Sequence, residues 1–304
     1  MKLFFQKKSY LFLLGLLCAI FFVTACEKPK TSQNIQNVLV SIPPYAYVVN
    51  KIAGDTVTVH TIVPPGFNPH IFEPKPSQII QWNPVQTWIC IGEGFEKKLY
   101  IVLKAQNPQL TILDLSGDAT IESEDHHEED HVHEHGSHCH HHEEKDLHFW
   151  LSPKIMQTQS EKIYKMLCKA YPKNSSLYQK NLEKFQGELK EIDTKISQNL
   201  ENSSYRTILV SHPAFAYFCR DYHLNQLSIE MEGKDPLPHH ITKVLETAKK
   251  AQIAGVLLQP QYSNKGAEII AKQLDLQTFE IDPYAYEYLS NLEQLVQTIS
   301  PIKQ

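Results

Sequence analysis

The sequence predicts an α/β protein of two lobes, each a mostly parallel sheet flanked by helices, joined by one long rigid helix. Three observations support this. Short apolar runs alternate with helical segments in both halves of the chain, as in parallel α/β sheets. A single apolar stripe with spacings of three and four predicts one helix over residues 175–202, between the two patterns. The 304 residues suffice for two lobes of ordinary size.

The first 25 residues have the features of an export signal. Three lysines precede an apolar run, 11–23, that is too short for a comfortable membrane span. A small residue then precedes Cys26, which resembles the lipobox of bacterial lipoproteins. That resemblance implies cleavage before Cys26, a lipid on its sulfur and a polar tether over 26–36. The alternative is an ordinary secretory peptide in which Cys26 has no role. We expect an exported protein, lipid-anchored to a bacterial membrane and facing the periplasm or the cell exterior.

The N-terminal lobe is predicted over residues 37–172. Gly54 should end its first helix, and Ser152 followed by Pro153 should begin its last, as an N-cap with proline at the first helical position. The proline-rich segment 64–77 is expected to be a stiff loop without helix. The expected strands are 38–42, 57–63, 87–91 and 110–113, and the expected helices are 45–52, 76–82, 95–105 and 153–170.

An insert over residues 117–145 interrupts this lobe. It is dense in His, Asp and Glu and has almost no apolar residues, so it cannot bury enough surface to order itself, and we predict that it is disordered. Its imidazoles could form an auxiliary metal-binding loop that raises the local metal concentration. The alternative is a solvated charged loop that binds metals incidentally. The histidines are His126, His127, His131, His133, His135, His138, His140, His141 and His142.

The linking helix, with its flanks, is assigned to residues 173–203 and the C-terminal lobe to 204–304. The second lobe repeats the alternation of strands and helices. Its expected strands are 207–211, 226–229, 254–258 and 277–281, and its expected helices are 213–222, 238–252, 264–274 and 287–299.

Four residues form a candidate metal site. His70 follows a strand in the proline-rich loop, and His148 immediately precedes a capped helix. His212 and Asp282 each stand at the C-terminal end of a predicted strand, where α/β sheets bind their ligands. Because each lobe supplies two of them, a site between the lobes would collect all four. Three imidazoles and one carboxylate form a tetrahedral set that suits Zn²⁺.

Each of these residues also has a plainer interpretation. His70 could be a loop histidine without a role, and His148 could hydrogen-bond a helix end. His212 could be buried and satisfied, and Asp282 could merely open a turn before Pro283. The occurrence of all four at equivalent points of the two lobes favours the metal site.

Four motifs around these residues resemble those of the cluster A-I, or ZnuA/TroA-like, solute-binding proteins, lipoproteins that deliver zinc or manganese to ABC transporters. They are Asn68-Pro69-His70 with the following Glu73-Pro74-Lys75-Pro76-Ser77, then Asp146 to Pro153, Ser211 to Phe218, and Glu280 to Pro283. The resemblance covers essentially the whole mature chain. The departures from the family pattern are Leu147 for proline, Pro213 for an acidic residue and Gln259 for glutamate.

The resemblance implies capture of a metal ion outside the membrane and its delivery to an ABC permease. Manganese members tend to have Glu where this chain has His212, so Zn²⁺ is the expected ion, with Mn²⁺ or Fe²⁺ as alternatives. His-rich loops near the second ligand are typical of zinc members. Some zinc members replace the carboxylate with water or another acid, so Glu230 or Glu232 could compete with Asp282. The resemblance leads us to expect a monomer.

Other function classes are less well supported. The net charge of −5 gives no electrostatic reason to expect a nucleic-acid partner. A zinc hydrolase keeps an open metal position and a nearby base, and the sequence contains no HExxH motif. We therefore expect no catalytic residues. If Asp282 does not bind, Glu230 is a candidate base. A surface adhesin or metal buffer without a transporter also stays open.

Overall fold

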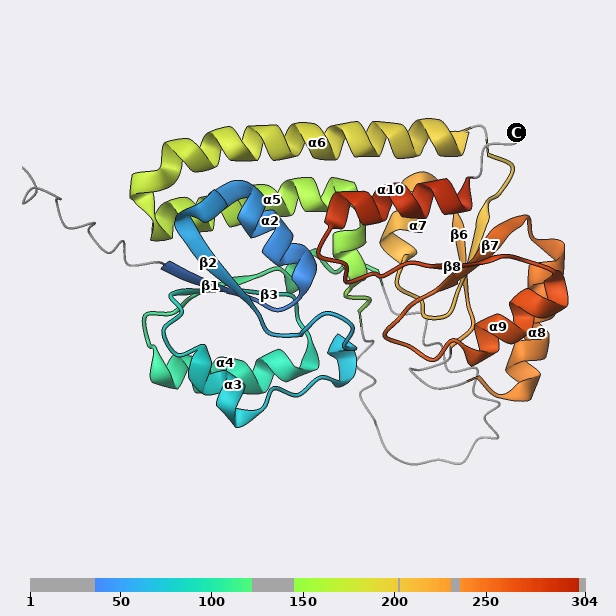
Figure 1. The fold of residues 1–304 in the computed structure, drawn as a ribbon, viewed down its shortest axis with the longest axis horizontal. Helices are drawn as coiled ribbons and strands as arrows, with labels where there is room; N and C mark the ends of the chain where they lie inside the picture. The colour runs from blue at the N-terminus through green and yellow to red at the C-terminus, as the bar shows by residue number, and fades with distance from the viewer. Residues whose placement is uncertain (1–35, 122–144, 202, 231–235, 301–304) are drawn as a thin grey trace, which may run out of the picture. The chain divides into compact units, whose positions relative to one another are not determined.

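The computed structural model describes residues 36–121, 145–201, 203–230 and 236–300 (Figure 1). The expected signal peptide, Cys26 and the nine histidines of the insert lie outside the described residues. None of the helices in the described ranges has the length and apolar character that a membrane crossing needs.

The N-terminal lobe contains a four-stranded parallel sheet in the order β2-β1-β3-β4. The two central strands are the more buried ones, as their apolar sequences require. Gly54 ends α2, with φ of 57°, a backbone conformation that glycine adopts without strain. The strands are β1 (Gln36–Val40), β2 (Val57–Thr61), β3 (Thr87–Cys90) and β4 (Thr111–Asp114), and the helices are α2 (Pro43–Ala53), α3 (Pro76–Gln81), α4 (Gly94–Gln106) and α5 (Pro153–Ala170).

The C-terminal lobe repeats this arrangement in the order β6-β5-β7-β8, again with all strands parallel. In Figure 1, α8 and α9 lie on the opposite side of this sheet from α10. The strands are β5 (Thr207–Val210), β6 (Asn225–Ser228), β7 (Ile253–Leu258) and β8 (Thr278–Glu280), and the helices are α7 (Ala216–Tyr222), α8 (Pro238–Lys250), α9 (Lys265–Leu274) and α10 (Tyr288–Ile299). The predicted two-lobe α/β fold is therefore confirmed.

The long helix α6 (Ser175–Glu201) packs against α2, α5 and α10, and so contacts elements of both lobes (Figure 1). At 1.5 Å per residue its length is roughly 40 Å. Every residue of the predicted stripe is buried, and Tyr178 extends it. Beside it, Trp150 Nε1 donates to the carbonyl of Pro283 over 2.8 Å, and Tyr288 Oη donates to the carbonyl of Trp150 over 2.8 Å. One apolar core cluster extends through both lobes, and the C-terminal lobe has a second cluster of its own.

Two local predictions were wrong. Residues Pro69–Ile71 form a short 3₁₀ turn, because Asn68 accepts the His70 amide through Oδ1 at 2.9 Å and proline suits the first position of the turn. Helix α7 begins three residues after Pro213, because the Phe215 amide donates to the Gln226 side chain at 2.6 Å instead of entering a helical ladder.

Candidate metal centre

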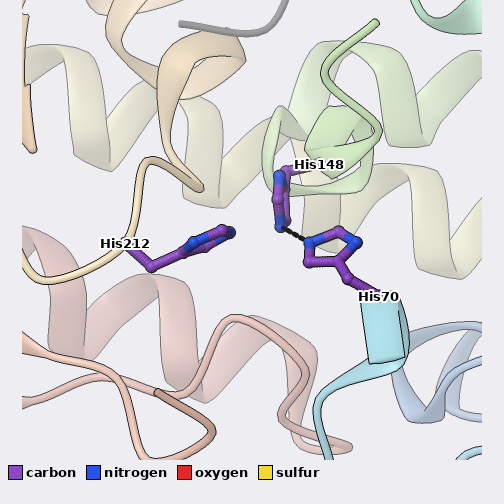
Figure 2. A group of neighbouring side chains, drawn as sticks. All are labelled: His70, His148 and His212. Carbon is purple, nitrogen blue, oxygen red and sulfur yellow. Dashed lines mark hydrogen bonds between the residues drawn. The ribbon is translucent and has the colours of Figure 1, made fainter. Parts of the chain in front are cut away.

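Three imidazoles from separate elements converge on one point (Figure 2). His70 lies in the 3₁₀ turn after β2, His148 begins a second 3₁₀ turn at residues His148–Leu151, and His212 follows β5. One ring nitrogen of each lies within 4.8 Å of the other two. The Nε2 atoms of His70 and His148 are 3.3 Å apart. The structure thus brings together the three predicted histidines from both lobes.

The three residues differ in their access to solvent. His148 and His212 are buried, at 4% and 8% exposed, whereas 31% of the His70 side chain is exposed. His70 therefore stands at the opening of the site, and the other two form its interior.

Backbone contacts fix the two interior histidines. The His148 amide donates to Asp146 Oδ1 at 2.8 Å. The amide of His212 donates to Gln259 Oε1 at 2.8 Å, and its carbonyl accepts from Gln259 Nε2 at 2.6 Å. A side-chain amide can satisfy both of these backbone atoms at once, because it carries a donor and an acceptor side by side.

Each imidazole also has a carboxylate on its outer nitrogen. His70 Nδ1 lies 3.1 and 3.2 Å from the two oxygens of Glu93, and His148 Nδ1 lies 2.7 Å from Asp146 Oδ1. His212 Nδ1 lies 2.9 Å from Glu230 Oε2. An ionised carboxylate can only accept, so Nδ1 of each ring carries a proton, and a ring in its neutral form has its lone pair on Nε2. Carboxylate–histidine pairs of this kind orient the ligands of metal sites.

The protein environment also sets the protonation of these rings. Loss of solvent around the ring would by itself lower the pKa of His70. The hydrogen bond and the negative charge of Glu93 outweigh this effect, so the pKa is raised. Burial, together with the nearby His148 and His70, holds the pKa of His212 well below its usual value. His212 is therefore neutral at physiological pH, as a metal ligand must be.

The arrangement has an electrostatic deficit that a cation would remove. Among the described residues, His212 Nε2 is buried without a hydrogen-bond partner. The Nε2 atoms of His70 and His148 are joined by a hydrogen bond of 3.3 Å, so one of these two nitrogens carries a proton that an ion would displace (Figure 2). Three carboxylates, the buried Glu93 and Asp146 and the largely covered Glu230, surround them. A divalent ion at the centre would bind all three imidazoles and balance the outer carboxylates.

Comparison with known proteins identifies the family of this chain. Residues 38–301 match the family model described as ZnuA, zinc-uptake complex component A, periplasmic. The chain belongs to the ZnuA family. The family membership that the four motifs indicated is thereby confirmed. Members are substrate-binding components of transporters that act outside the cytoplasm.

Individual relatives match over most of the chain. A protein of Chlamydia trachomatis serovar D, to which metal binding is ascribed, is 33% identical over 84% of this chain and 88% of its own length. The zinc-binding lipoprotein AdcA of Streptococcus pneumoniae is 27% identical over 91% of this chain, which spans about half of AdcA (55%).

Solved structures of ZnuA family members share the fold. A crystal structure of ZnuA is 33% identical, with a TM-score of 0.78 over 88% of this chain and 98% of that one. The periplasmic zinc-binding protein TroA of Treponema pallidum is 16% identical, with a TM-score of 0.71 over 88% of this chain and 100% of TroA, and shows the likeness of fold alone.

The structure does not place Asp282 with the three histidines. Its Oδ1 accepts from the backbone amide of Tyr284 at 2.8 Å and from Gln261 Nε2 at 2.7 Å. The carboxylate thus closes a turn, which is the plainer interpretation that the sequence left open. Of the two competing acids, Glu230 binds the outer nitrogen of His212, and Glu232 lies outside the described residues.

Sequence reasoning missed several residues of this ZnuA-family site. Glu93 lies in the glycine turn after β3, and its position at the carboxyl end of a strand was an available signal. Asp146 also gave an available signal, since an acid two residues before a histidine can accept from both the amide and the ring of that histidine. Tyr262 and Tyr284 gave no such signal. Tyr262 stacks on His212 with ring centroids 3.8 Å apart and planes at 7°.

Proposed function

We propose that this protein binds one zinc ion through His70, His148 and His212 and delivers it to the permease of an ABC-type uptake transporter. The observation that carries the proposal is the convergence of three imidazole rings, each of which has its outer nitrogen, Nδ1, hydrogen-bonded to a carboxylate. Such a set is complete before an ion arrives and needs only small adjustments to bind one.

Zinc is the ion that this donor set suits best. Imidazole nitrogen is a borderline ligand that Zn²⁺ accepts in tetrahedral sites, whereas Mn²⁺ prefers more oxygen and higher coordination. Relatives point the same way. A ZnuA deletion mutant solved with zinc bound is 32% identical, with a TM-score of 0.76 over 88% of this chain and 97% of that one.

We further propose that Cys26 carries a lipid that holds the protein at the outer face of the membrane. The support is the export signal followed by a small residue and a cysteine. Residues 122–144, with their nine histidines, serve in this proposal as weak auxiliary zinc sites.

The other functions lack a supporting observation in the described residues. The Glu230 carboxylate, the base that a hydrolase would need, binds the outer nitrogen of His212. Laminin-binding proteins share the fold, but at 19–20% identity they say nothing of adhesion in this chain. We propose a transport protein without catalytic activity.

Metal loading tests the proposed function. The full-length protein is stripped of metal, offered equal Zn²⁺ and Mn²⁺, and then exchanged against a tight chelator that removes weakly held ions. One retained zinc ion per chain is expected for the wild type. His148→Ala should retain none, because a central ligand is missing. The matched control is His239→Ala, since His239 is exposed at the start of α8, and it should load like the wild type. Preferential retention of manganese by the wild type would refute the zinc assignment.

A further inference from the structure

The hydroxyl of Tyr284 lies among the three imidazoles. Its Oη is 3.0 Å from His148 Nε2 and 3.4 Å from His70 Nε2. The side chain is buried at 2% exposed and comes from the C-terminal lobe, as does its hydrogen-bond partner Tyr262, whose Oη is 2.9 Å away. In this arrangement the phenol O–H donates a hydrogen bond to an imidazole lone pair, from the direction in which an ion would bind.

These distances are those of a tetrahedral site. Zinc bonds to nitrogen and oxygen are about 2.0–2.1 Å long, so any two donors of a regular tetrahedron lie about 3.3 Å apart. The separation of the two Nε2 atoms is 3.3 Å, and those from the phenol oxygen to each of them are 3.0 and 3.4 Å. All three agree with tetrahedral edges. The phenol oxygen therefore stands at a corner of the tetrahedron, where sequence reasoning had placed Asp282.

We propose that Tyr284 supplies the fourth donor to the zinc ion, through its hydroxyl oxygen. The inference rests on the proposed function, because it needs an ion at the three histidines. When the ion arrives, a lone pair of the phenol oxygen turns towards it, and the O–H bond turns from the imidazole to Tyr262 Oη. No proton leaves the site in this step, and Tyr262 is already in place to accept.

The surroundings of Tyr284 hold its oxygen at this position. Asp282 Oδ1 accepts from the Tyr284 amide, and Trp150 packs against its ring with centroids 5.4 Å apart. Trp150 also donates to the carbonyl of Pro283, next to Tyr284 in the chain. Asp282 thus acts on the ion indirectly, as a positioning residue that fixes the turn carrying the donor. Three nitrogens and one oxygen fill the tetrahedron and leave little room for the six ligands of larger ions.

Two nearly isosteric variants distinguish Tyr284 as the fourth ligand from Asp282 as the fourth ligand. Tyr284→Phe keeps the ring and removes only the oxygen. Asp282→Asn keeps an oxygen that can accept from Gln261 and the Tyr284 amide, but it removes the negative charge that a carboxylate ligand would bring. Both are made in the full-length protein and compared with the wild type by one-equivalent Co²⁺ absorption and by zinc competition against a tight chelator. Thermal unfolding of the metal-free proteins checks that each variant folds.

We expect Tyr284→Phe to change the visible Co²⁺ bands and to raise the zinc dissociation constant about tenfold or more. Asp282→Asn should have a smaller effect and leave the Co²⁺ bands in place, because the oxygen that fixes the turn remains. If Asp282→Asn also weakens binding, the double variant should be no weaker than Tyr284→Phe, because both changes act through one oxygen. Unchanged bands and affinity in Tyr284→Phe would overturn the inference, as would an added loss in the double variant. A wild type that retains no zinc would overturn the proposed function itself, which separates the two failures.

Discussion

Asp146 offers the sharpest test of how the outer carboxylates support metal binding. Its Oδ1 accepts from both the ring and the amide of His148, and both residues are buried. Asp146→Asn keeps an oxygen at the same position and removes the charge. The amide can still accept from Nδ1, but it no longer strengthens the electron donation of Nε2 to the ion. We expect weaker zinc binding with little change in the metal-free fold.

The structure predicts that Asp146→Asn should weaken zinc binding more than the equivalent change at Glu93. Loss of an outer partner of a metal-binding histidine typically costs 10–100-fold in affinity, or about 1.4–2.8 kcal/mol. The contact of Asp146 with His148 is short, 2.7 Å, and enclosed, so Asp146→Asn should fall near the upper end. Glu93 lies 3.1 Å from a histidine whose side chain is 31% exposed, so water can replace part of its contribution. Glu93→Gln should therefore fall near the lower end.

Zinc competition against a graded series of chelators measures both variants in the full-length protein. The metal-free proteins are compared by thermal unfolding, in which Asp146→Asn should lie within a few degrees of the wild type, because its hydrogen-bond acceptor remains. An Asp146→Asn protein that binds zinc as tightly as the wild type would refute the reasoning. So would a larger loss in Glu93→Gln, because the ranking follows from burial and distance.

Three further predictions concern ion choice, the insert and pH. His212→Glu should shift loading from zinc towards manganese by adding a carboxylate oxygen, as metal analysis after mixed loading would show; an unchanged ratio would contradict it. Deleting residues 122–144 should lower the total zinc bound while one tight site remains. The tight site should persist because the Asp146 amide donates to the Ile121 carbonyl at 2.9 Å, so the chain on either side of the deletion is already joined. In the intact protein, zinc binding by the loop should fade below about pH 6 as the imidazoles protonate. Calorimetry that counts equal zinc at pH 5.5 and 7.5 in the intact protein would argue against the loop sites. Burial raises the pKa of Glu96 to about 7, so the folded state keeps a proton that the unfolded chain loses above roughly pH 4.3. The free energy of unfolding should therefore fall by about 4 kcal/mol between those values as pH rises. Urea unfolding of metal-free Glu96→Gln should lack this slope, and parallel curves for the two proteins would rule the explanation out.

The sequence was sufficient to predict most elements because their signals are local. The N-cap at Ser152 formed as expected, with its Oγ accepting from the Ile155 amide at 3.1 Å. The apolar stripe of α6 could be recognised in the sequence because each of its residues is buried against the core. Strand order carries no such local signal: β1 lies between β2 and β3 through pairings that depend on the whole lobe. Position at the end of a strand was enough to find His212, since parallel strands deliver their carboxyl ends to one edge.

The structure gives Asp282 a role in a turn, and the sequence could not distinguish that role from ion binding. An aspartate before Pro283 can either bind an ion or accept from the amide two residues on, and both uses give the same local sequence. The choice depends on what else reaches the site, and Tyr284 reaches it from the same turn. A tyrosine has no spacing rule that connects it to histidines 136 and 214 residues away in the chain. That contact follows only from the packing of one lobe on the other.

Both sheets secure their site-bearing ends by the same kind of bridge. Ser41 after β1 and Ser211 after β5 each donate to a side chain of the third strand's connection, Glu96 in one lobe and Gln259 in the other. Each bridging side chain also accepts a backbone amide at a strand end, that of Ile91 or of His212. Glu93, which binds His70, and His212 are thereby fixed to their own sheets.

The distance left to adjust when an ion binds is therefore the one between the lobes. The ring nitrogens already lie within 4.8 Å of one another, and tetrahedral binding needs about 3.3 Å, so the approach required is at most about 1.5 Å. A shared core along α6 and α10 permits a displacement of that size more readily than a wide hinge opening. Capture should then involve a small closure around His70, the exposed ligand, and release should require that the lobes be separated by a similarly small amount.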